Sequence, residues 1–511
     1  MQNNDKKVLL RISNLKQYFP LKGGRFVKAN DGITLDIYEG ETFGLVGESG
    51  CGKSTLGRTI LQLYHQTYGR TMYYGRSLDD LAPKYVIDTV KNLKARRTKL
   101  RELEQKRDKL EADYAKLSEK EQYAKHGELD TARKLAEDAL LDITKIVGGF
   151  LVVDDLDPVI AAYSKDYAIA RKLSSMEEKR QELLVDVDDA EYAKKTAEEA
   201  GKSGKDGQLQ KAQEKLKQCD DQIAALRSQL DAGRKEIEAL RAPYANDPEF
   251  QKYEAYRDDG IDLARLEYNE MRRLRRDMQL IFQDPYSSLN PRMSVGQIIS
   301  EGMQAHNMIK KKDARMQEMV LKIMDDCGLA PYFLHRFPHQ FSGGQRQRIG
   351  IARALATKPK FVVCDEAVSA LDVSIQAQII NLLLDLKEQQ NLTYMFITHD
   401  LSVVKYISDR VGVMYLGTMV ELAAADEIFH HPIHPYTEAL LNAIPTTDTV
   451  GAKELSILEG DIPSPVNPPK GCKFHTRCKY CTEICTQVVP EWEEVRPNHF
   501  VACHHKLAAK E

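Results

Sequence analysis

The residues with the clearest chemistry are the nine from 47 to 55, which read GESGCGKST. Glycines at this spacing, followed by lysine and serine, form a loop whose backbone N–H groups point at phosphate oxygens. In such a loop Lys53 reaches the β- and γ-phosphates of a nucleotide, and the Ser54 hydroxyl binds Mg²⁺. We therefore expect the whole loop to hold a nucleoside triphosphate; its residues are Gly47, Glu48, Ser49, Gly50, Cys51, Gly52, Lys53, Ser54 and Thr55.

The loop has the flanking elements that this chemistry requires. The apolar segment 42–46 before it is a predicted strand, and the segment 56–64 after it is a predicted helix. A phosphate bound between them would lie at the helix N-terminus, where free N–H groups and the helix dipole favour an anion. This context separates the loop from a chance match to a short pattern.

A second glycine-rich segment far downstream also begins a predicted helix. Free N–H groups at such a helix start form another candidate anion site. Its residues are Ser342, Gly343, Gly344 and Gln345.

Polar residues also end two predicted strands. The apolar segment 361–364 ends in Asp365 and Glu366, and the segment 394–398 ends at His399. A buried strand that ends in acids can place an Asp near Mg²⁺ and a Glu near the attacking water. Each of these features alone is common at a turn or a strand end, but their order along one chain indicates a shared nucleotide site.

This order of motifs resembles that of the ATP-binding-cassette (ABC) ATPases. Residues 341–345 (FSGGQ) are similar to the signature motif of that family, Gln283 to its Q-loop, Asp365–Glu366 to its Walker B pair and residues 369–372 to its D-loop. The resemblance implies an α/β fold with a RecA-like core and a helical subdomain. It also implies that two cassettes enclose two ATP molecules, so that each signature acts on the partner's nucleotide.

The resemblance implies a role for each matching residue. Glu366 would be the general base, His399 would contact the γ-phosphate, and Gln283 would sense Mg²⁺ and relay closure to a membrane subunit. The implied Mg²⁺ ligands are Ser54, Gln283 and Asp365. The adenine would stack on Phe19, or less favourably on Tyr18; core packing is the alternative role, because burial uses the same aromatic side chains.

Longer segments narrow the resemblance to the ATPases of oligopeptide and dipeptide importers, and among them to the F-type subunit. They are residues 280–295, 341–356, 399–422, 434–440 and 462–465. This resemblance implies ATP hydrolysis coupled to peptide import. The implied partners are a second, D-type ATPase subunit in a heterodimer, two transmembrane permease subunits and, indirectly, an extracellular peptide-binding protein.

Composition limits the other functions that the chain could have. The 511 residues allow two to four domains, and a net charge of −3 argues against nucleic acid as a partner. No apolar run approaches the roughly 18 residues that cross a bilayer. We therefore expect a peripheral protein at the cytoplasmic face of the cell membrane.

Cysteines gather near the C-terminus. Five of the nine follow residue 470: Cys472, Cys478, Cys481, Cys485 and Cys503. So many thiols in a short intracellular segment indicate a metal site. The importer resemblance implies that Cys472, Cys478, Cys485 and Cys503 hold a [4Fe–4S] cluster, with Cys481 as an extra thiol. Zinc stays an alternative, because a four-thiolate site suits it equally, and so does the absence of metal.

A long insertion separates the phosphate loop from Gln283. Apolar residues recur every seven positions among charged ones, at Leu209, Leu216, Ile223, Leu230 and Ile237. This repeat predicts a coiled coil. We expect one antiparallel pair between segments near 86–117 and 209–240, with its tip near 148–158. The pair would be either a contact arm for an unknown partner or a solvated helix pair without one.

The predicted domain organisation follows from these segments. It comprises an ABC ATPase domain in two parts (1–75 and 258–425), the coiled-coil insertion (76–257) and an importer-type C-terminal region with the cysteine cluster (426–511). The alternative function is a non-transport ABC ATPase with a coiled-coil arm, of the SMC-like or ribosome-associated kind. SMC-type arms lie between the Q-loop and the signature, whereas this insertion precedes Gln283, which favours transport.

Overall fold

The computed structural model describes residues 6–117, 119–201, 206–310, 315–369, 371–443 and 460–507. The chain forms two compact units. We call residues 1–75 and 272–511 the sheet unit, and residues 76–271 the helical unit. Ala370, which belongs to the predicted D-loop, lies outside the described residues. Among the helices described, none has the length and apolar character needed to span a membrane.

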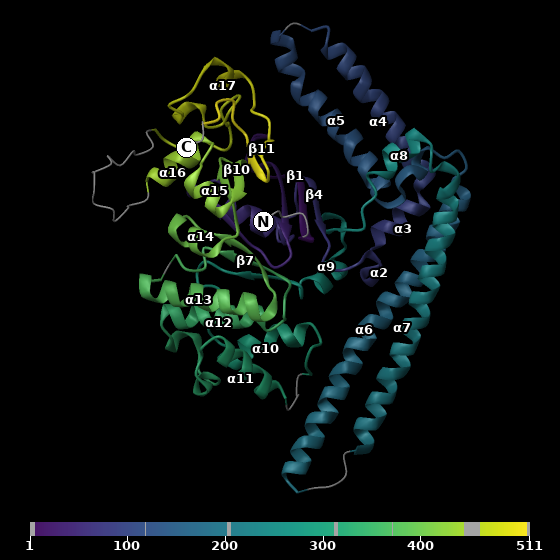
Figure 1. The fold of residues 1–511 in the computed structure, drawn as a ribbon, viewed down its shortest axis with the longest axis vertical. Helices are drawn as coiled ribbons and strands as arrows, with labels where there is room; N and C mark the ends of the chain where they lie inside the picture. Colours follow the sequence, from purple (N-terminus) through teal and green to yellow (C-terminus); the bar gives the residue numbers. More distant parts are fainter. Residues whose placement is uncertain are drawn as a thin grey trace. The chain divides into compact units, whose positions relative to one another are not determined.

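An eight-stranded sheet frames the sheet unit (Figure 1). Its strand order is β11–β12–β10–β9–β3–β8–β7–β6, and the five strands from β9 to β6 run parallel. Every residue of β3, β7 and β8 is buried, as is typical of parallel strands covered on both faces. The strands are β3 (Thr42–Val46), β6 (Met278–Ile281), β7 (Phe361–Asp365), β8 (Thr393–Ile397), β9 (Arg410–Tyr415), β10 (Thr418–Ala424), β11 (Glu493–Arg496) and β12 (His499–Val501).

The C-terminal strands are part of this same sheet. β12 pairs antiparallel with β10, and β11 pairs with β12. A second, antiparallel sheet carries the aromatic candidates for adenine stacking. Within the sheet unit its order is β2 (Phe26–Tyr38), β1 (Val8–Pro20), β4 (Tyr68–Tyr73).

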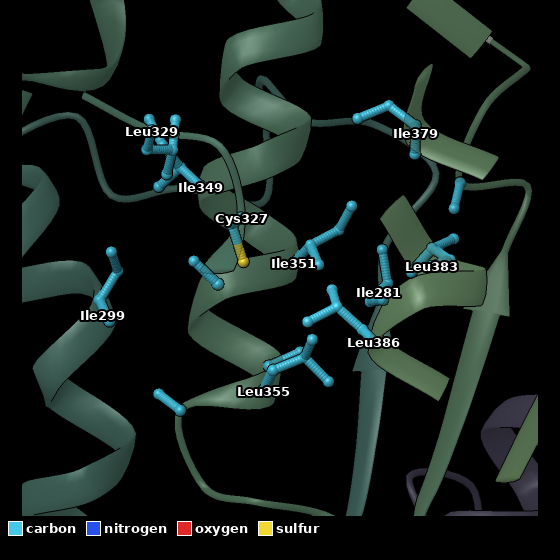
Figure 2. Packing of buried hydrophobic residues seen from close by; sticks show 14 of the residues in the cluster. Ile281, Ile299, Cys327, Leu329, Ile349, Ile351, Leu355, Ile379, Leu383 and Leu386 are labelled. Atoms are coloured by element: carbon cyan, nitrogen blue, oxygen red, sulfur yellow. The ribbon is translucent and has the colours of Figure 1, made fainter. Parts of the chain in front are cut away.

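Helices cover the sheet and form the main core. Figure 2 shows α12 packing Ile349, Ile351 and Leu355 against apolar side chains from β6, α10 and α13. The helices of this unit are α1 (Lys53–Ile60), α10 (Val295–Ala305), α11 (Met316–Asp326), α12 (Gly343–Leu355), α13 (Val373–Gln390), α14 (Leu401–Ile407), α15 (Ala425–His430), α16 (Pro435–Asn442) and α17 (Glu483–Gln487), with short 3₁₀ turns η4 (Pro331–Phe333), η5 (Pro338–Gln340) and η6 (His475–Arg477).

The helical unit contains two helix pairs instead of the predicted single pair. α4 packs along α5, and α6 packs along α7. Its elements are α2 (Leu78–Leu81), α3 (Lys84–Lys91), α4 (Leu93–Tyr114), α5 (Glu119–Val147), η1 (Gly148–Val152), α6 (Asp157–Glu199), α7 (Asp206–Arg241), η2 (Ala242–Tyr244), α8 (Pro248–Glu254), β5 (Ile261–Asp262), η3 (Leu263–Arg265) and α9 (Tyr268–Leu274), which continues into the sheet unit.

The α6–α7 pair is antiparallel. Along its ion pairs the residue number increases on α6 and decreases on α7: Lys165–Glu236, Glu177–Arg227 and Arg180–Asp220. Of the heptad residues predicted for α7, Ile223, Leu230 and Ile237 are buried, whereas Leu209 and Leu216 are half-buried.

The predicted pairing of segments 86–117 and 209–240 is therefore wrong, and so is the predicted tip. Residues 148–151 are buried, and Phe150 packs edge-to-face against Phe250 with ring centroids 5.6 Å apart. Gly149 lies so close to Phe250 that a Cβ there would be 2.5 Å from its ring. The physical reason is the hydrophobic effect. Burial at the base of the helix pairs stabilises the apolar run 146–153, whereas a tip would leave this run exposed to water.

Candidate nucleotide-hydrolysis site

The carboxyl ends of four neighbouring parallel strands carry the predicted catalytic residues. The phosphate loop follows β3, His399 follows β8, Asp365 and Glu366 end β7, and Gln283 follows β6. In the order β3–β8–β7–β6 these ends lie along one edge of the sheet. Ligands of open α/β sheets bind at this edge, so the fold brings together residues that are far apart in sequence.

Close backbone contacts explain the glycines of the phosphate loop. Gly52 has φ of 101°, and a Cβ there would lie 2.1 Å from the carbonyl oxygen of Ala29. Gly47 has φ of 149°, and its Cβ would lie 2.2 Å from the carbonyl oxygen of Met414. Only glycine fits these two positions, which let the loop curve closely before α1 begins.

The Lys53 amine lies inside the curve of the loop. Lys53 is buried, and its Nζ donates hydrogen bonds to the carbonyl oxygens of Gly47 at 2.7 Å and Glu48 at 3.1 Å. A buried cation surrounded by loop carbonyls and the N-terminus of α1 is suited to bind phosphate oxygens.

The residues expected to hold Mg²⁺ offer oxygen ligands side by side. Ser54 Oγ donates to Asp365 Oδ1 at 2.5 Å, and Asp365 is fully buried. A hydroxyl and a carboxylate are ligands that Mg²⁺ prefers, so these two residues fit the ion. Arg58 Nη2 lies 3.1 Å from Asp365 Oδ2. Sequence reasoning missed Arg58, although it stands one helical turn after Ser54.

The Glu366 carboxylate, the predicted general base, is engaged on both oxygens. Gln283 Nε2 donates to Glu366 Oε2 at 2.6 Å, and His399 Nδ1 lies 3.6 Å from Glu366 Oε1. The backbone of Glu366 has φ of 47°, in the left-handed region that costs a non-glycine residue energy and occurs most often at functional sites. The structure thus brings three of the four predicted catalytic side chains into one group.

The signature segment lines a groove with this group. Ser342 caps α12: Gln345 N donates to its Oγ at 3.4 Å, and Ser342 N donates to Gln345 Oε1 at 3.1 Å. A groove of about 770 Å³ is lined by Gln283, Asp284, Pro285, Tyr286, Ser342, Gly343, Gly344, Glu366, Ser369, Leu371, Asp372, Ile375 and His399. None of the described residues of the phosphate loop lines this groove.

Both aromatic candidates for adenine stacking lie in β1. The half-buried ring of Phe19 packs edge-to-face on Tyr64, with centroids 5.3 Å apart. The hydroxyl of Tyr18 donates to Asp31 Oδ1 at 2.5 Å. Sequence reasoning missed Asp31, because its connection to the site depends on the pairing of β1 with β2.

Glu48 of the phosphate loop has partners that sequence reasoning also missed. Its carboxylate accepts hydrogen bonds from Arg477, and its backbone N–H donates to the hydroxyl of Tyr436 at 2.9 Å. Tyr436 belongs to the segment 434–440 that carried the importer resemblance. That segment was the available signal, but the partners lie about 400 residues apart in sequence, and only the fold joins them.

The cysteines near the C-terminus are neighbours in the structure. Burial, together with the nearby thiols of Cys472, Cys478 and Cys485, raises the pKa of the Cys503 thiol to about 12. Burial likewise raises the pKa of Cys472 to about 11. Within the described ranges, no three His, Cys, Asp or Glu side chains are arranged to hold a single metal ion. Cys481 is exposed.

Comparison with known proteins gives two family matches. The family model described as "ABC transporter" matches residues 30–251 and 253–369, and the one described as "Oligopeptide/dipeptide transporter, C-terminal region" matches residues 420–485. Together these matches span the phosphate loop, the acidic end of β7 and part of the cysteine cluster.

Two relatives from Bacillus subtilis (strain 168) illustrate the similarity. "Oligopeptide transport ATP-binding protein AppF" is 52% identical over 250 residues, which cover 48% of this chain and 75% of AppF. "Putative oligopeptide transport ATP-binding protein YkfD" is 34% identical over 498 residues, which cover 97% of this chain and 95% of YkfD. The chain therefore belongs to the ABC transporter family, as an ATP-binding protein of its oligopeptide/dipeptide importer group.

Proposed function

We propose that this chain hydrolyses ATP to drive the import of peptides through separate membrane subunits. The observation that carries the proposal is the grouping of Gln283, Glu366 and His399 at the sheet edge that also holds the phosphate loop. A carboxylate held by two neighbouring side chains is a suitable general base for the water that attacks ATP. Ser54 and Asp365 would hold the Mg²⁺ that neutralises the phosphate charge.

The site would be completed by a second ATPase subunit. In this proposal Ser342, Gly343, Gly344 and Gln345 act on the nucleotide of the partner. The first three line a groove that includes none of the described residues of this chain's phosphate loop. We assign the chain to the F-type, with a D-type subunit as its heterodimer partner. The complex would include two permease subunits at the cytoplasmic face of the membrane and would receive peptides from an extracellular binding protein.

The cysteine cluster would hold an iron–sulfur cluster. The thiols of Cys472, Cys478, Cys485 and Cys503 are neighbours, and four thiolates are the usual ligands of a [4Fe–4S] cluster. The group would be structural, since peptide import requires no electron.

The helical unit would provide a contact arm. We assign the α6–α7 pair as a coiled coil, because its buried heptad positions and its ion pairs run along the shared face. A helix of 43 residues extends over roughly 65 Å, which gives the arm a long surface for a partner protein.

The test is stimulation of ATP hydrolysis by peptide. The complete transporter is purified from membranes and its ATPase rate is measured with and without peptide-loaded binding protein. The proposal predicts that peptide raises the rate. Stimulation by ribosomes or by DNA, with no response to peptide, would overturn it in favour of the non-transport alternative.

A further inference from the structure

We propose that the loop Cys472–Cys478 positions the ATP site through two separate contacts. Two of its basic residues, Arg477 and Lys473, contact the phosphate loop and the strand next to the aromatic candidates for adenine stacking. The inference rests on the proposed ATP hydrolysis and adds positioning residues to it.

Arg477 fixes the side chain of Glu48. Its Nη1 and Nη2 donate to the two carboxylate oxygens of Glu48 at 2.7 Å and 3.0 Å. A two-bond pair of this kind sets both distance and direction, which a lysine cannot do. Only 4% of the Arg477 side chain is exposed, against 23% of the Glu48 side chain. The pair is therefore largely shielded from water, and removal of one partner leaves a partly buried charge.

Tyr436 fixes the backbone at the same residue. Its hydroxyl accepts the Glu48 N–H at 2.9 Å. The ring is fully buried and packs against Phe474, at 5.2 Å between centroids, and against Tyr415, at 4.8 Å. Phe474 belongs to the Cys472–Cys478 loop. The loop thus supports the phosphate loop through an aromatic contact as well as through an ion pair.

Lys473 makes the second contact, with Asp31 of β2. Its Nζ donates to Asp31 Oδ2 at 3.1 Å and to the carbonyl oxygen of Leu416 at 3.2 Å. Asp31 accepts the Tyr18 hydroxyl on its other oxygen. Burial alone would raise the pKa of Asp31, but Lys473, Tyr18 and Lys16 together lower it to about 2. Asp31 is therefore ionised at neutral pH and holds Lys473 and Tyr18 together.

The Cys472–Cys478 loop is itself held in shape by its backbone. Arg477 N donates to the carbonyl oxygen of Phe474 at 3.0 Å, and Cys472 N donates to that of Cys485 at 2.8 Å. Arg477 and Lys473 thus project from one fixed turn. Contacts that fix a binding loop before its ligand arrives lower the entropy cost of binding. We infer that they raise the affinity of the site for ATP and leave the chemical step to Glu366.

The experiment compares the ATP affinity of variants in the complete transporter. Arg477→Ala is expected to weaken binding of a fluorescent ATP analogue about tenfold or more, the effect of losing a charged hydrogen-bonded pair. The ATPase KM should rise by a similar factor, while kcat at saturating ATP stays within about threefold. Arg477→Lys should give an intermediate loss, because it keeps the charge and loses the two-bond geometry.

Lys479→Ala is the matched control. Lys479 flanks Cys478 on the other side, but it pairs with Glu438 and not with the phosphate loop. The double variant Glu48→Arg with Arg477→Glu restores the ion pair in reverse and should recover a substantial part of the lost affinity. Its recovery would also show that the folded loop persists.

The outcomes separate this inference from the proposed function. An unchanged KM in Arg477→Ala, or an equal loss in Lys479→Ala, would overturn the inference. So would a fall in kcat alone. A wild-type complex without peptide-stimulated hydrolysis would instead overturn the proposed function, whatever the variants do.

Discussion

Gln283 donates a 2.6 Å hydrogen bond to the carboxylate of Glu366. His399 lies on the other carboxylate oxygen, at 3.6 Å. A general base that activates water needs a free lone pair directed at that water. Each carboxylate oxygen has two lone pairs, so Glu366 keeps an acceptor site for water while Gln283 holds one oxygen. The position of Gln283 therefore sets the orientation of the base.

The first prediction concerns the charge on Glu366. Glu366→Gln should lower ATP hydrolysis by about 10² to 10⁴-fold, because the amide cannot accept a proton from water. Binding of an ATP analogue should stay within about threefold, since the phosphate loop is intact. Steady-state hydrolysis and equilibrium binding, measured side by side, check both parts. Glu388→Gln, at an exposed position of α13, is the control and should leave the rate unchanged.

The second prediction concerns Mg²⁺. Ser54 and Asp365 offer their oxygens side by side, so Ser54→Ala should reduce the affinity for ATP in the presence of Mg²⁺. Removal of Mg²⁺ with EDTA should weaken binding to the wild type and have little further effect on the variant. A variant that loses as much affinity on EDTA treatment as the wild type would exclude Ser54 as a ligand.

The third prediction concerns acid. His434 is buried, its Nδ1 accepts the N–H of Tyr436, and burial lowers its pKa to about 4, although Glu421 opposes this shift. Because the unfolded chain holds this proton more tightly, with a pKa of about 6.5, stability is full above that pH. It should fall by roughly 3 kcal/mol as the pH drops from 6.5 to 4.

The matched variant for this prediction is His434→Asn. Asparagine can still cap α16 by accepting the N–H of Tyr436, but it does not titrate. Thermal unfolding of both proteins across this pH range measures the difference. The gap in midpoint between them should narrow or reverse toward pH 4; parallel curves would show that His434 does not titrate on unfolding.

Much of the nucleotide site could be predicted from sequence, because its chemistry is local. The phosphate loop, Asp365 and Glu366 stand next to apolar segments that the structure confirms as β3 and β7. The contacts of Glu48 with Arg477 and Tyr436 could not be predicted, since they join segments about 400 residues apart and follow no short pattern.

For the helical unit, the sequence predicted a buried helix face but not the helix that packs on it. The heptad repeat correctly marked the buried face of α7, yet it gave the wrong partner, because any apolar stripe of this period can pack on any other. The apolar run 146–153 was the sequence feature that argued against a tip at this position. A run of that kind is too costly to expose at a tip and forms part of a core at the base of the two helix pairs.

The fourth prediction tests this base. Phe150 is 1% exposed and packs against Phe250, so Phe150→Ala should destabilise the helical unit by about 3–5 kcal/mol. Leu135→Ala, at a residue of α5 that is 47% exposed, should cost less than about 1 kcal/mol. Denaturant unfolding followed by circular dichroism distinguishes them. Equal, small losses would mean that 148–152 is an exposed tip after all.

The most direct test of peptide import is uptake of labelled peptide into vesicles that contain the complete transporter, with ATP on the side of this subunit. The wild type should accumulate peptide only when ATP and Mg²⁺ are present, and the Glu366→Gln variant should bind ATP but accumulate almost none. Uptake that persists in the variant, or wild-type ATP hydrolysis without any uptake of peptide, would contradict the account.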